Sequence, residues 1–402
     1  MIPVKSTMRS SLTNPSLAPT PAHRLLSLDV LRGITIAFMI MVNNNSGPGS
    51  WHFMNHAAWN GLTPTDLVYP TFLFVMGASI VFAVEARLAR GVTRAQLAWH
   101  TLRRAATLFL LGIVVNSFPF FALAHMRIYG VLQRIAICYL VVGLLYLWEK
   151  RALTYVAALV VALVGYWLLL RWVPVPGIGM PGRDIPFMDP YTNIVNWLDR
   201  LMIPHHLGER WPDYNLRETQ GLLSNIPSVG TTLVGLLTAL WLRGRKTVVA
   251  KTVGLAAASM GCLAAGYLWQ IWFPLNKRLW TSSFVLVAAG WSLTVLALIY
   301  WAVEQSGWGK DRGKGWVRPW LVLGSNAIVA YMFSELLANG LWAIHFTADG
   351  TRTDPLLYTF THVFTRNIPN PGWAAFAYSV SFLAVCFLPV WFLYRKKIFV
   401  KV

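Results

Sequence analysis

Long runs of apolar residues, separated by short polar stretches, recur along the whole chain. Ten of these runs are about 17–25 residues long, enough for a helix to cross a hydrocarbon core of about 30 Å. We interpret them as helices, because they lack the alternation of apolar and polar residues that a membrane β-barrel requires. The sequence therefore predicts an all-α, polytopic transmembrane bundle with about ten spans. The spans cover residues 25–43, 66–86, 101–119, 129–148, 152–171, 221–242, 250–273, 281–302, 320–346 and 372–394.

The longest polar segment between two spans covers residues 172–220 on the predicted non-cytoplasmic side. Its first part is rich in proline, which predicts an irregular loop. Ile194, Trp197, Leu198 and Leu201 then recur at helical spacing. This pattern predicts an amphipathic helix that lies on the outer membrane interface or covers the end of the bundle.

The rest of the chain reads as one domain. We expect a single membrane domain at 25–395, between cytoplasmic tails at 1–24 and 396–402. The first 24 residues are polar and contain no apolar core, so no cleavable signal peptide is predicted. The apolar stretch at 320–346 is long enough to include a break.

Composition and charge support a membrane protein and exclude other classes. Of the 402 residues, 56% are hydrophobic and 12% are charged, which excludes a disordered chain and an ordinary soluble domain. The net charge of +19 would suggest nucleic acid in a soluble protein, but most of the 34 Lys and Arg residues fall on one side of the alternating spans. This positive-inside bias predicts that both termini are cytoplasmic, and no nucleic-acid partner is expected. The three cysteines lie in apolar runs without the spacing of a metal site, so no metal is predicted.

A polar loop between the first two spans, Asn43 to Asp66, carries the densest candidate chemistry. It holds no Lys or Arg, and it interleaves asparagines, tryptophans and His56. Amides and aromatic rings are common contacts for sugars, and a histidine exchanges protons near neutral pH. A surface loop anchored at the interface by its tryptophans explains the same residues. Asp66 fits both readings, because it also stands where a helix-capping carboxylate would.

Two charged residues lie deep inside predicted spans. Arg134 is about five residues, roughly 8 Å, into the fourth span, and Glu335 is in the outer half of the ninth. Such charges are costly in a membrane and are default functional candidates. A structural ion pair of Arg134 with Asp66 or Glu335 is the competing interpretation.

Three more arginines lie near the predicted cytoplasmic ends of the spans. Asp29 and Arg32 stand three residues apart, on one helix face, where simple pairing at a helix end would explain them. Arg103 and Arg104 begin the third span, where they fit positive-inside anchors. No phosphate loop, G-x-S-x-G elbow or H-E-x-x-H motif is present. From the residues alone, an enzyme that works across the membrane and a transporter remain equally open.

Several motifs resemble one known family. LSLDVLRGITIAFMIMVNN, NHAAWNGLTPTDLVYPTFLFVMGAS, VLQRIAICYL, NKRLWTSSFVL and GSNAIVAYMFSELL look like the heparan-α-glucosaminide N-acetyltransferase family. Its lysosomal member transfers acetyl from cytosolic acetyl-CoA to a terminal glucosamine in the lumen. The resemblance covers nearly the whole chain. It implies a membrane acetyltransferase that uses acetyl-CoA as co-substrate. The acceptor would be an amino sugar or a glycan that carries one. The resemblance also suggests that the chain forms a homodimer.

The resemblance also implies roles for individual residues. His56 would be the catalytic base that takes the proton from the attacking amine, or the nucleophile that first accepts the acetyl group. Asn43 would hold His56 or the thioester oxygen. We further expect acceptor binding by Trp59, Asn60, Asp66 and Glu335, and contacts to the CoA phosphates from Arg32, Arg103, Arg104 and Arg134.

Two departures from the family pattern concern the acceptor. The stretch Glu218–Gly221 reads E-T-Q-G where the family often has D-P-E-G, and Ser334-Glu335 replaces a His-Glu pair. The luminal domain of the lysosomal enzyme has no counterpart here, which suggests a bacterial-type relative in the inner membrane that acts on smaller sugars. An O-acyltransferase for a polysaccharide hydroxyl and a transporter of a small sugar conjugate stay open as alternatives.

Overall fold

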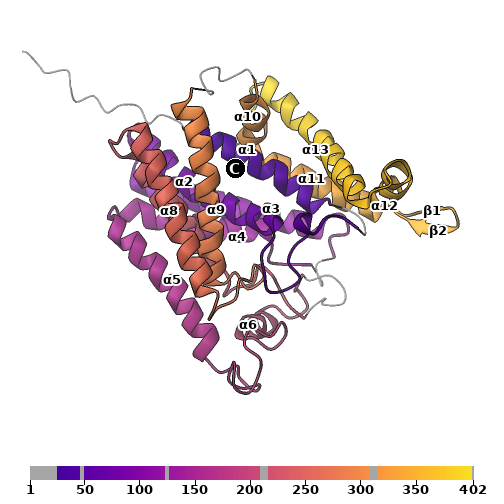
Figure 1. Cartoon of the computed structure of the whole chain (residues 1–402), viewed down its shortest axis with the longest axis horizontal. Helices are drawn as coiled ribbons and strands as arrows, with labels where there is room; N and C mark the ends of the chain where they lie inside the picture. The colour runs from indigo at the N-terminus through magenta and orange to yellow at the C-terminus, as the bar shows by residue number, and fades with distance from the viewer. Residues whose placement is uncertain (1–24, 46–48, 123–125, 209–215, 308–314, 401–402) are drawn as a thin grey trace, which may run out of the picture.

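The fold is taken from a computed structural model, which describes residues 25–45, 49–122, 126–208, 216–307 and 315–400. The predicted N-terminal tail at 1–24 lies outside the described residues. Within them, 13 α-helices and one two-stranded hairpin form an all-α, polytopic architecture, as the sequence predicts (Figure 1). In chain order, the elements are α1 Leu26–Asn43, η1 His52–Met54, α2 Pro64–Leu88, α3 Arg94–Ser117, α4 Val131–Trp148, α5 Ala152–Trp172, α6 Ile194–Met202, α7 Asn225–Arg243, α8 Val248–Trp269, α9 Ser282–Tyr300, η2 Trp301–Gln305, α10 Val317–Ser325, α11 Ala327–Ala343, β1 Phe346–Ala348, β2 Thr351–Thr353, α12 Pro355–Thr359, η3 Phe360–Thr365 and α13 Pro371–Arg395.

Each of the ten predicted spans is helical, although not all are equally apolar. In the described part of the chain, eight helices are long and apolar enough to cross a membrane: α1, α2, α4, α5, α7, α8, α9 with η2, and α13. Helices α10 and α11, bent by 78°, pass the same test only as a pair, as one broken span or a re-entrant segment. Helix α3 covers the remaining predicted span, but it carries Arg103 and Arg104 and does not reach the same hydropathy.

The break expected in the 320–346 stretch is confirmed at Asn326, where α10 and α11 meet at an angle of 78°. The Asn326 side chain binds the C-terminal segment at this bend. Its Nδ2 donates to the Ile398 carbonyl at 3.0 Å, and its Oδ1 accepts from the Val400 backbone N–H at 2.9 Å. The side chain thus satisfies backbone groups that the broken helix and the chain end would otherwise leave open.

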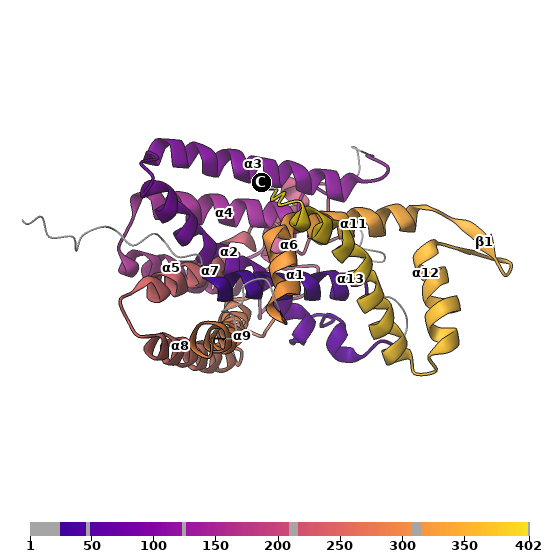
Figure 2. The same ribbon diagram turned by 90° about the horizontal axis from the view of Figure 1, so that it is seen from above.

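Close helix crossings hold the centre of the bundle together. Helices α2 and α7 pack along each other, and α1 packs against α10 (Figure 2). A Cβ atom at Gly77 of α2 would overlap the Thr232 carbonyl of α7, and one at Gly235 of α7 would overlap the Phe74 carbonyl of α2. Small residues let membrane helices approach this closely, so these positions fix the distance between the two backbones.

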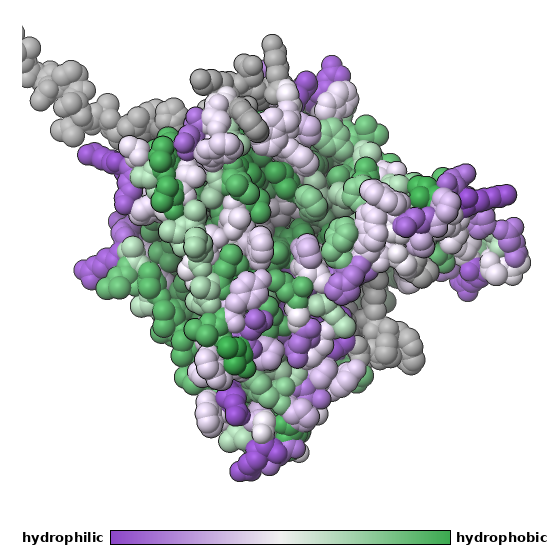
Figure 3. Space-filling model, in the orientation of Figure 1, coloured by the Kyte–Doolittle hydropathy of each residue, from purple (hydrophilic) through white to green (hydrophobic). Residues whose placement is uncertain are grey.

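The outer surface of the bundle is apolar where lipid would lie. In the 18-residue apolar stretch of each helix, only 11% of the α8 residues and 22% of the α5 residues are buried. Figure 3 shows hydrophobic side chains gathered over the face that contains α5, α8 and α9, with hydrophilic side chains at the ends of these helices. Exposed apolar surface of this extent is typical of helices that face a bilayer, and we treat the chain as an integral membrane protein.

The 172–220 segment folds at one end of the bundle, and its predicted helix is present as α6 (Figure 1). The Asn193 side chain caps this helix by accepting from the Asn196 backbone N–H at 3.0 Å. Ile194 and Val195 are buried, whereas Leu201 and Met202 are exposed. The helix therefore covers the bundle with one face and turns its last apolar residues outward.

Candidate active site

A histidine–carboxylate pair forms the centre of the candidate site. His56 lies in the loop that follows η1, and Asp66 lies in the first turn of α2. The His56 Nδ1 is 2.8 Å from the Asp66 Oδ1. The Asp66 side chain is 1% exposed, whereas His56 keeps 44% of its side-chain surface exposed. A buried carboxylate thus orients an accessible imidazole.

The start of α2 explains why Asp66 stands there. Thr63 is the N-cap, Pro64 begins the helix, and Asp66 occupies the third helical position. The Asp66 Oδ2 accepts from the Thr63 backbone N–H and from the Ala57 backbone N–H, both at 3.1 Å. The capping interpretation of Asp66 is therefore confirmed, and the second oxygen of the same carboxylate faces His56.

The third member of the cluster is Lys277, which the sequence reasoning missed. It lies in the loop between α8 and α9, and its side chain is 19% exposed. The Lys277 Nζ is 3.0 Å from the His56 Nδ1, 3.4 Å from its Nε2 and 3.4 Å from the Asp66 Oδ1. Burial lowers the pKa of Lys277 to about 8, while Asp66 acts in the opposite direction. The one sequence signal was an Asn-Lys-Arg triplet at the outer end of a span, where the charge bias disfavours basic residues.

The protonation of His56 follows from these neighbours. Burial of the ring lowers the pKa of His56 below its ordinary value of 6.5, and the Lys277 cation acts in the same direction, whereas the hydrogen bond to Asp66 raises it. An Nδ1–H that donates to Asp66 leaves the lone pair on Nε2, with the Lys277 Nζ 3.4 Å away. The arrangement is thus that of a neutral base held in one tautomer.

The loop around His56 is fixed by contacts to two distant segments. The Asn276 Nδ2 donates to the Asn60 Oδ1 at 3.1 Å, and the Gly61 backbone N–H donates to the Leu275 carbonyl at 2.8 Å. The Trp59 Nε1 donates to the Met188 carbonyl at 2.9 Å. Trp59 and Asn60, predicted acceptor ligands, thus hold the loop in place, and Trp59 is partly exposed with the Arg217 guanidinium 5.2 Å from its ring centre.

Asn43 and Glu335 lie together, although the sequence reasoning did not pair them. The Asn43 Nδ2, at the end of α1, donates to the Glu335 Oε1 of α11 at 2.8 Å. The side chains that contact the His56 Nδ1 are Asp66 and Lys277, and the predicted role of Asn43, to hold His56 or the thioester oxygen, stays a prediction. Asn43 is exposed at the C-terminal end of α1, and Glu335 is half-buried in the middle of α11, so this pair forms a second polar group between the two helices.

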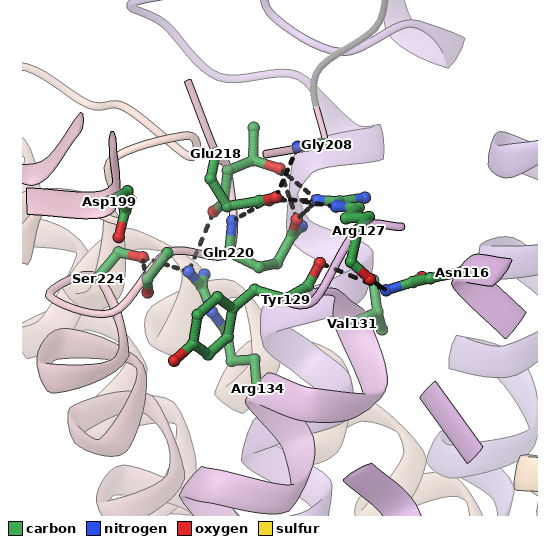
Figure 4. Close-up of polar contacts among 12 residues, drawn as sticks. Asn116, Arg127, Tyr129, Val131, Arg134, Asp199, Gly208, Glu218, Gln220 and Ser224 are labelled. Atoms are coloured by element: carbon green, nitrogen blue, oxygen red, sulfur yellow. Dashed lines mark hydrogen bonds and ion pairs between the residues drawn. The ribbon is translucent and has the colours of Figure 1, made fainter. Parts of the chain in front are cut away.

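Arg134 does not form the predicted ion pair with Asp66 or Glu335. Its Nη2 donates to the Thr219 carbonyl at 3.0 Å and to the Ser224 Oγ, and its guanidinium lies 4.7 Å from the centre of the Trp280 ring. The side chain is fully buried, and within the described residues its Nε and Nη1 have no hydrogen-bond partner. Arg134 pairs with no carboxylate because the 216–224 segment folds over the end of α4 and supplies neutral hydrogen-bond acceptors to it (Figure 4).

The same segment binds a second arginine that the sequence reasoning passed over. Arg127 donates through its Nε to the Glu218 Oε2 at 3.0 Å and through its Nη2 to the Glu218 Oε1 and the Gln220 side chain (Figure 4). The Glu218 side chain is fully buried. The sequence departure at Glu218–Gly221 therefore anchors a loop, through a planar two-point contact that suits arginine.

Asp199 of α6 completes this outer polar cluster. Its Oδ1 accepts from the Leu222 backbone N–H at 2.9 Å, and the side chain is buried. Burial raises the pKa of Asp199 to about 7, against the opposing effect of the Leu222 hydrogen bond, and nearby Glu218 raises it further.

The remaining predicted arginines lie away from His56. Arg32 donates to the Asp29 Oδ1 at 3.1 Å, to the Ser79 Oγ at 2.6 Å and toward the Gly324 carbonyl, which confirms the predicted pairing at the start of α1. Arg104 is half-buried against the Tyr139 ring at 4.7 Å, and Arg103 is exposed on α3. Of these three, Arg103 is the most available to a ligand.

Comparisons with known proteins identify the relatives of this chain. A family model described as "Heparan-alpha-glucosaminide N-acetyltransferase, catalytic" matches residues 24–249. A curated heparan-alpha-glucosaminide N-acetyltransferase from Homo sapiens is 27% identical over 429 residues, with 94% of this chain and 60% of the relative covered. The protein of the same name from Mus musculus is 26% identical over 374 residues, with 81% of this chain and 55% of the relative covered. The chain thus spans less than two thirds of the length of either relative.

Proposed function

Because the chain belongs to the heparan-alpha-glucosaminide N-acetyltransferase family, we propose that it transfers acetyl from acetyl-CoA to the amine of a glucosamine-type sugar. The observation that carries this proposal is the His56–Asp66 pair. An accessible imidazole held by a buried carboxylate at 2.8 Å is a suitable base for amine activation. Carboxylate–histidine pairs also relay protons in transporters, so the family match is what favours acyl transfer here.

The chemical step requires one base and one leaving thiolate. The neutral amine of the acceptor attacks the thioester carbonyl, and a C–N bond forms. The His56 Nε2 takes the proton from the amine nitrogen, while Asp66 stabilises the imidazolium through Nδ1. The C–S bond then breaks, and the CoA thiolate leaves and takes up a proton, which regenerates the base. We prefer direct transfer of this kind, and an acetyl-histidine intermediate is the alternative route.

Acetyl-CoA would approach from the side that carries Arg103. Arg32 and Asn43 are 11 positions apart on α1, which corresponds to roughly 17 Å along the helix axis. The extended pantetheine arm would therefore have to bridge from the arginine side to the His56 side. Arg103 and Arg104 remain our candidates for the phosphates, while the contacts of Arg32 to Asp29 and Ser79 favour a structural role for it.

The acceptor would lie against the polar groups around His56. Asn43 presents an amide at the end of α1, Glu335 a carboxylate in the middle of α11, and the partly exposed Trp59 an indole ring beside Arg217. Such groups suit a sugar ring with several hydroxyls. Asp66 supports catalysis rather than acceptor binding in this proposal, since all its contacts are internal.

Thiol release from acetyl-CoA tests the proposal directly. Purified protein in detergent is mixed with acetyl-CoA and with glucosamine, with glucose, or with no sugar, and free CoA thiol and acetylated product are measured together. We expect thiol release with glucosamine and an equal amount of N-acetyl product. Release with glucose instead would support O-acylation. No release with either sugar, together with uptake of labelled sugar into proteoliposomes, would support the transporter.

The orientation in the membrane is also part of the proposal. We propose that both termini lie in the cytoplasm of a bacterial cell and that the His56 loop faces outward, because most basic residues lie on the terminal side. Single cysteines at position 2 and in the 172–192 loop, treated with an impermeant reagent on intact cells, should label only in the loop. Size-exclusion chromatography with light scattering would decide between a monomer and the homodimer that the resemblance raises.

A further inference from the structure

Three chain segments bring opposite charges together at His56. The imidazole comes from the loop after η1, the carboxylate of Asp66 from α2, and the ammonium of Lys277 from the α8–α9 loop. The three groups form a triangle with sides of 2.8, 3.0 and 3.4 Å between the His56 Nδ1, the Asp66 Oδ1 and the Lys277 Nζ. The proposed acetyl transfer needs only the first two of these groups, so Lys277 requires its own explanation.

The α8–α9 loop is built to hold Lys277 in one place. The Asn276 Oδ1 accepts from the Leu279 backbone N–H at 2.8 Å, and the Asn276 backbone N–H donates to the Thr281 Oγ1 at 3.0 Å. The Trp280 backbone N–H donates to the Lys277 carbonyl at 3.1 Å. Asn276 and Trp280 are both buried. The backbone on either side of Lys277 is therefore rigid, and the side chain has little freedom to leave the pair.

The charge balance around the ring favours an unprotonated imidazole. The Lys277 Nζ lies within 3.4 Å of both ring nitrogens, so a second positive charge on the ring would be repelled at contact distance. Arg278, next in sequence, adds repulsion, and Arg134 adds positive potential near Lys277. Asp66 is the carboxylate that faces the ring, and it is shared between the ring and Lys277.

We propose that Lys277 is a positioning residue that keeps His56 unprotonated at neutral pH and in the tautomer whose Nδ1–H faces Asp66. The ammonium does so in two ways. It disfavours the imidazolium before the acceptor arrives, and it holds Asp66 ionised, so that Nδ1 must carry the ring proton. The role assigned here rests on the proposed function of His56 as the base, but the state of the ring exists without any substrate.

The protonation of His56 is measured without activity by carbethoxylation. Diethyl pyrocarbonate modifies an imidazole only in its neutral form. The modification rate of the His56 peptide, followed by mass spectrometry between pH 5 and 8, therefore gives the titration midpoint of that ring. Lys277→Met removes the charge and keeps the length of the side chain, while Lys277→Arg keeps the charge. His345, exposed between α11 and β1, serves as the internal reference in each sample.

The expected result is an upward shift of the His56 midpoint by about one pH unit in Lys277→Met, and little shift in Lys277→Arg. The His345 midpoint should not move. Equal midpoints in wild type and Lys277→Met, or an equal upward shift in both variants, would overturn the proposal, because charge would not be the cause. Lys277→Gln replaces the Met variant if that protein aggregates on size-exclusion chromatography, and it should give the same upward shift.

Transfer activity provides a second readout that separates this proposal from the proposed function. In Lys277→Met, the acidic limb of kcat/KM should move to higher pH, and activity should approach that of wild type above about pH 8, where wild-type Lys277 has itself lost its proton. A purely structural role would lower activity equally at all pH values. If no variant and no wild-type sample transfers acetyl, the proposed function fails, while the carbethoxylation midpoints still decide the role of Lys277.

Discussion

Replacing Asp66 with Asn isolates the charge that supports His56. The side chain keeps its size, but it loses the negative charge 2.8 Å from the His56 Nδ1. The Thr63 and Ala57 backbone N–H groups both donate to Oδ2, so the amide oxygen of Asn keeps these two contacts and its nitrogen turns to His56. An amide nitrogen pointed at His56 would favour the opposite tautomer and place the proton on Nε2, where the amine proton should go.

The size of the effect follows from the distance and the exposure. Two unit charges 2.8 Å apart interact by about 1.5 kcal/mol in bulk water and by about 6 kcal/mol at an effective dielectric constant of 20. His56 is 44% exposed, so an intermediate value of about 3 kcal/mol is appropriate for the imidazolium that forms during transfer. Because each 1.36 kcal/mol changes a rate about tenfold, kcat should fall roughly 100-fold.

The assay measures the rate of product formation at saturating acetyl-CoA and glucosamine. The rate is divided by the amount of folded protein, which size-exclusion chromatography determines. Asp354→Asn is the matched control, because Asp354 caps α12 through the Leu356 and Leu357 backbone N–H groups and lies outside the candidate site. That variant should keep wild-type kcat. A folded Asp66→Asn protein with kcat within threefold of wild type would refute the role of the carboxylate and leave Asp66 as a helix cap alone.

The neighbouring packing gives three stability tests, each read as a thermal midpoint in detergent. Arg134→Met should leave the thermal midpoint unchanged or raise it, because the substitution removes a buried charge that has only neutral acceptors. Arg134→Lys should lower the midpoint, because lysine lacks the planar fork of arginine. A lower midpoint for the Met variant than for the Lys variant would contradict this. Asp199 has a pKa raised to about 7 by burial, so its contribution to stability falls as pH rises from about 4 to 7, and Asp199→Asn should raise the midpoint at pH 8 more than at pH 5. Equal gains at both pH values would oppose that assignment. Gly235→Ala, whose Cβ would overlap the Phe74 carbonyl, should cost about 1–3 kcal/mol, whereas Gly261→Ala, in open space on α8, should cost nothing; equal midpoints would show that α2 and α7 can separate at no cost.

The architecture was predictable because the membrane imposes a strong, local constraint. Runs of apolar residues must become helices in lipid, and each predicted span is helical in the structure. Proline and helical periodicity likewise located the loop after α5 and helix α6. The limit of this reasoning is visible at α3, where length and position indicate a span but Arg103, Arg104 and other polar residues lower its hydropathy.

The site was only partly predictable, because its contacts join segments far apart in the chain. His56 and Asp66 lie ten positions apart in one loop–helix unit, so residue types there pointed to both. Lys277 follows Asp66 by more than 200 residues, and no periodicity connects them. Arg134 was misassigned for a related reason. Charge complementarity suggested Asp66 or Glu335 as the partner of Arg134. In the fold, the Arg134 side chain instead donates to a carbonyl and a hydroxyl from the loop before α7.

The central claim is that His56 is the base for acetyl transfer to an amino sugar. Its most direct test compares wild type with His56→Ala for acetylated glucosamine formed from acetyl-CoA, with acetyl-CoA affinity measured on the same samples and His345→Ala as the control. The account predicts that His56→Ala loses at least about 100-fold in kcat at unchanged acetyl-CoA affinity, while His345→Ala keeps wild-type activity. Turnover by His56→Ala within a few-fold of wild type would contradict it.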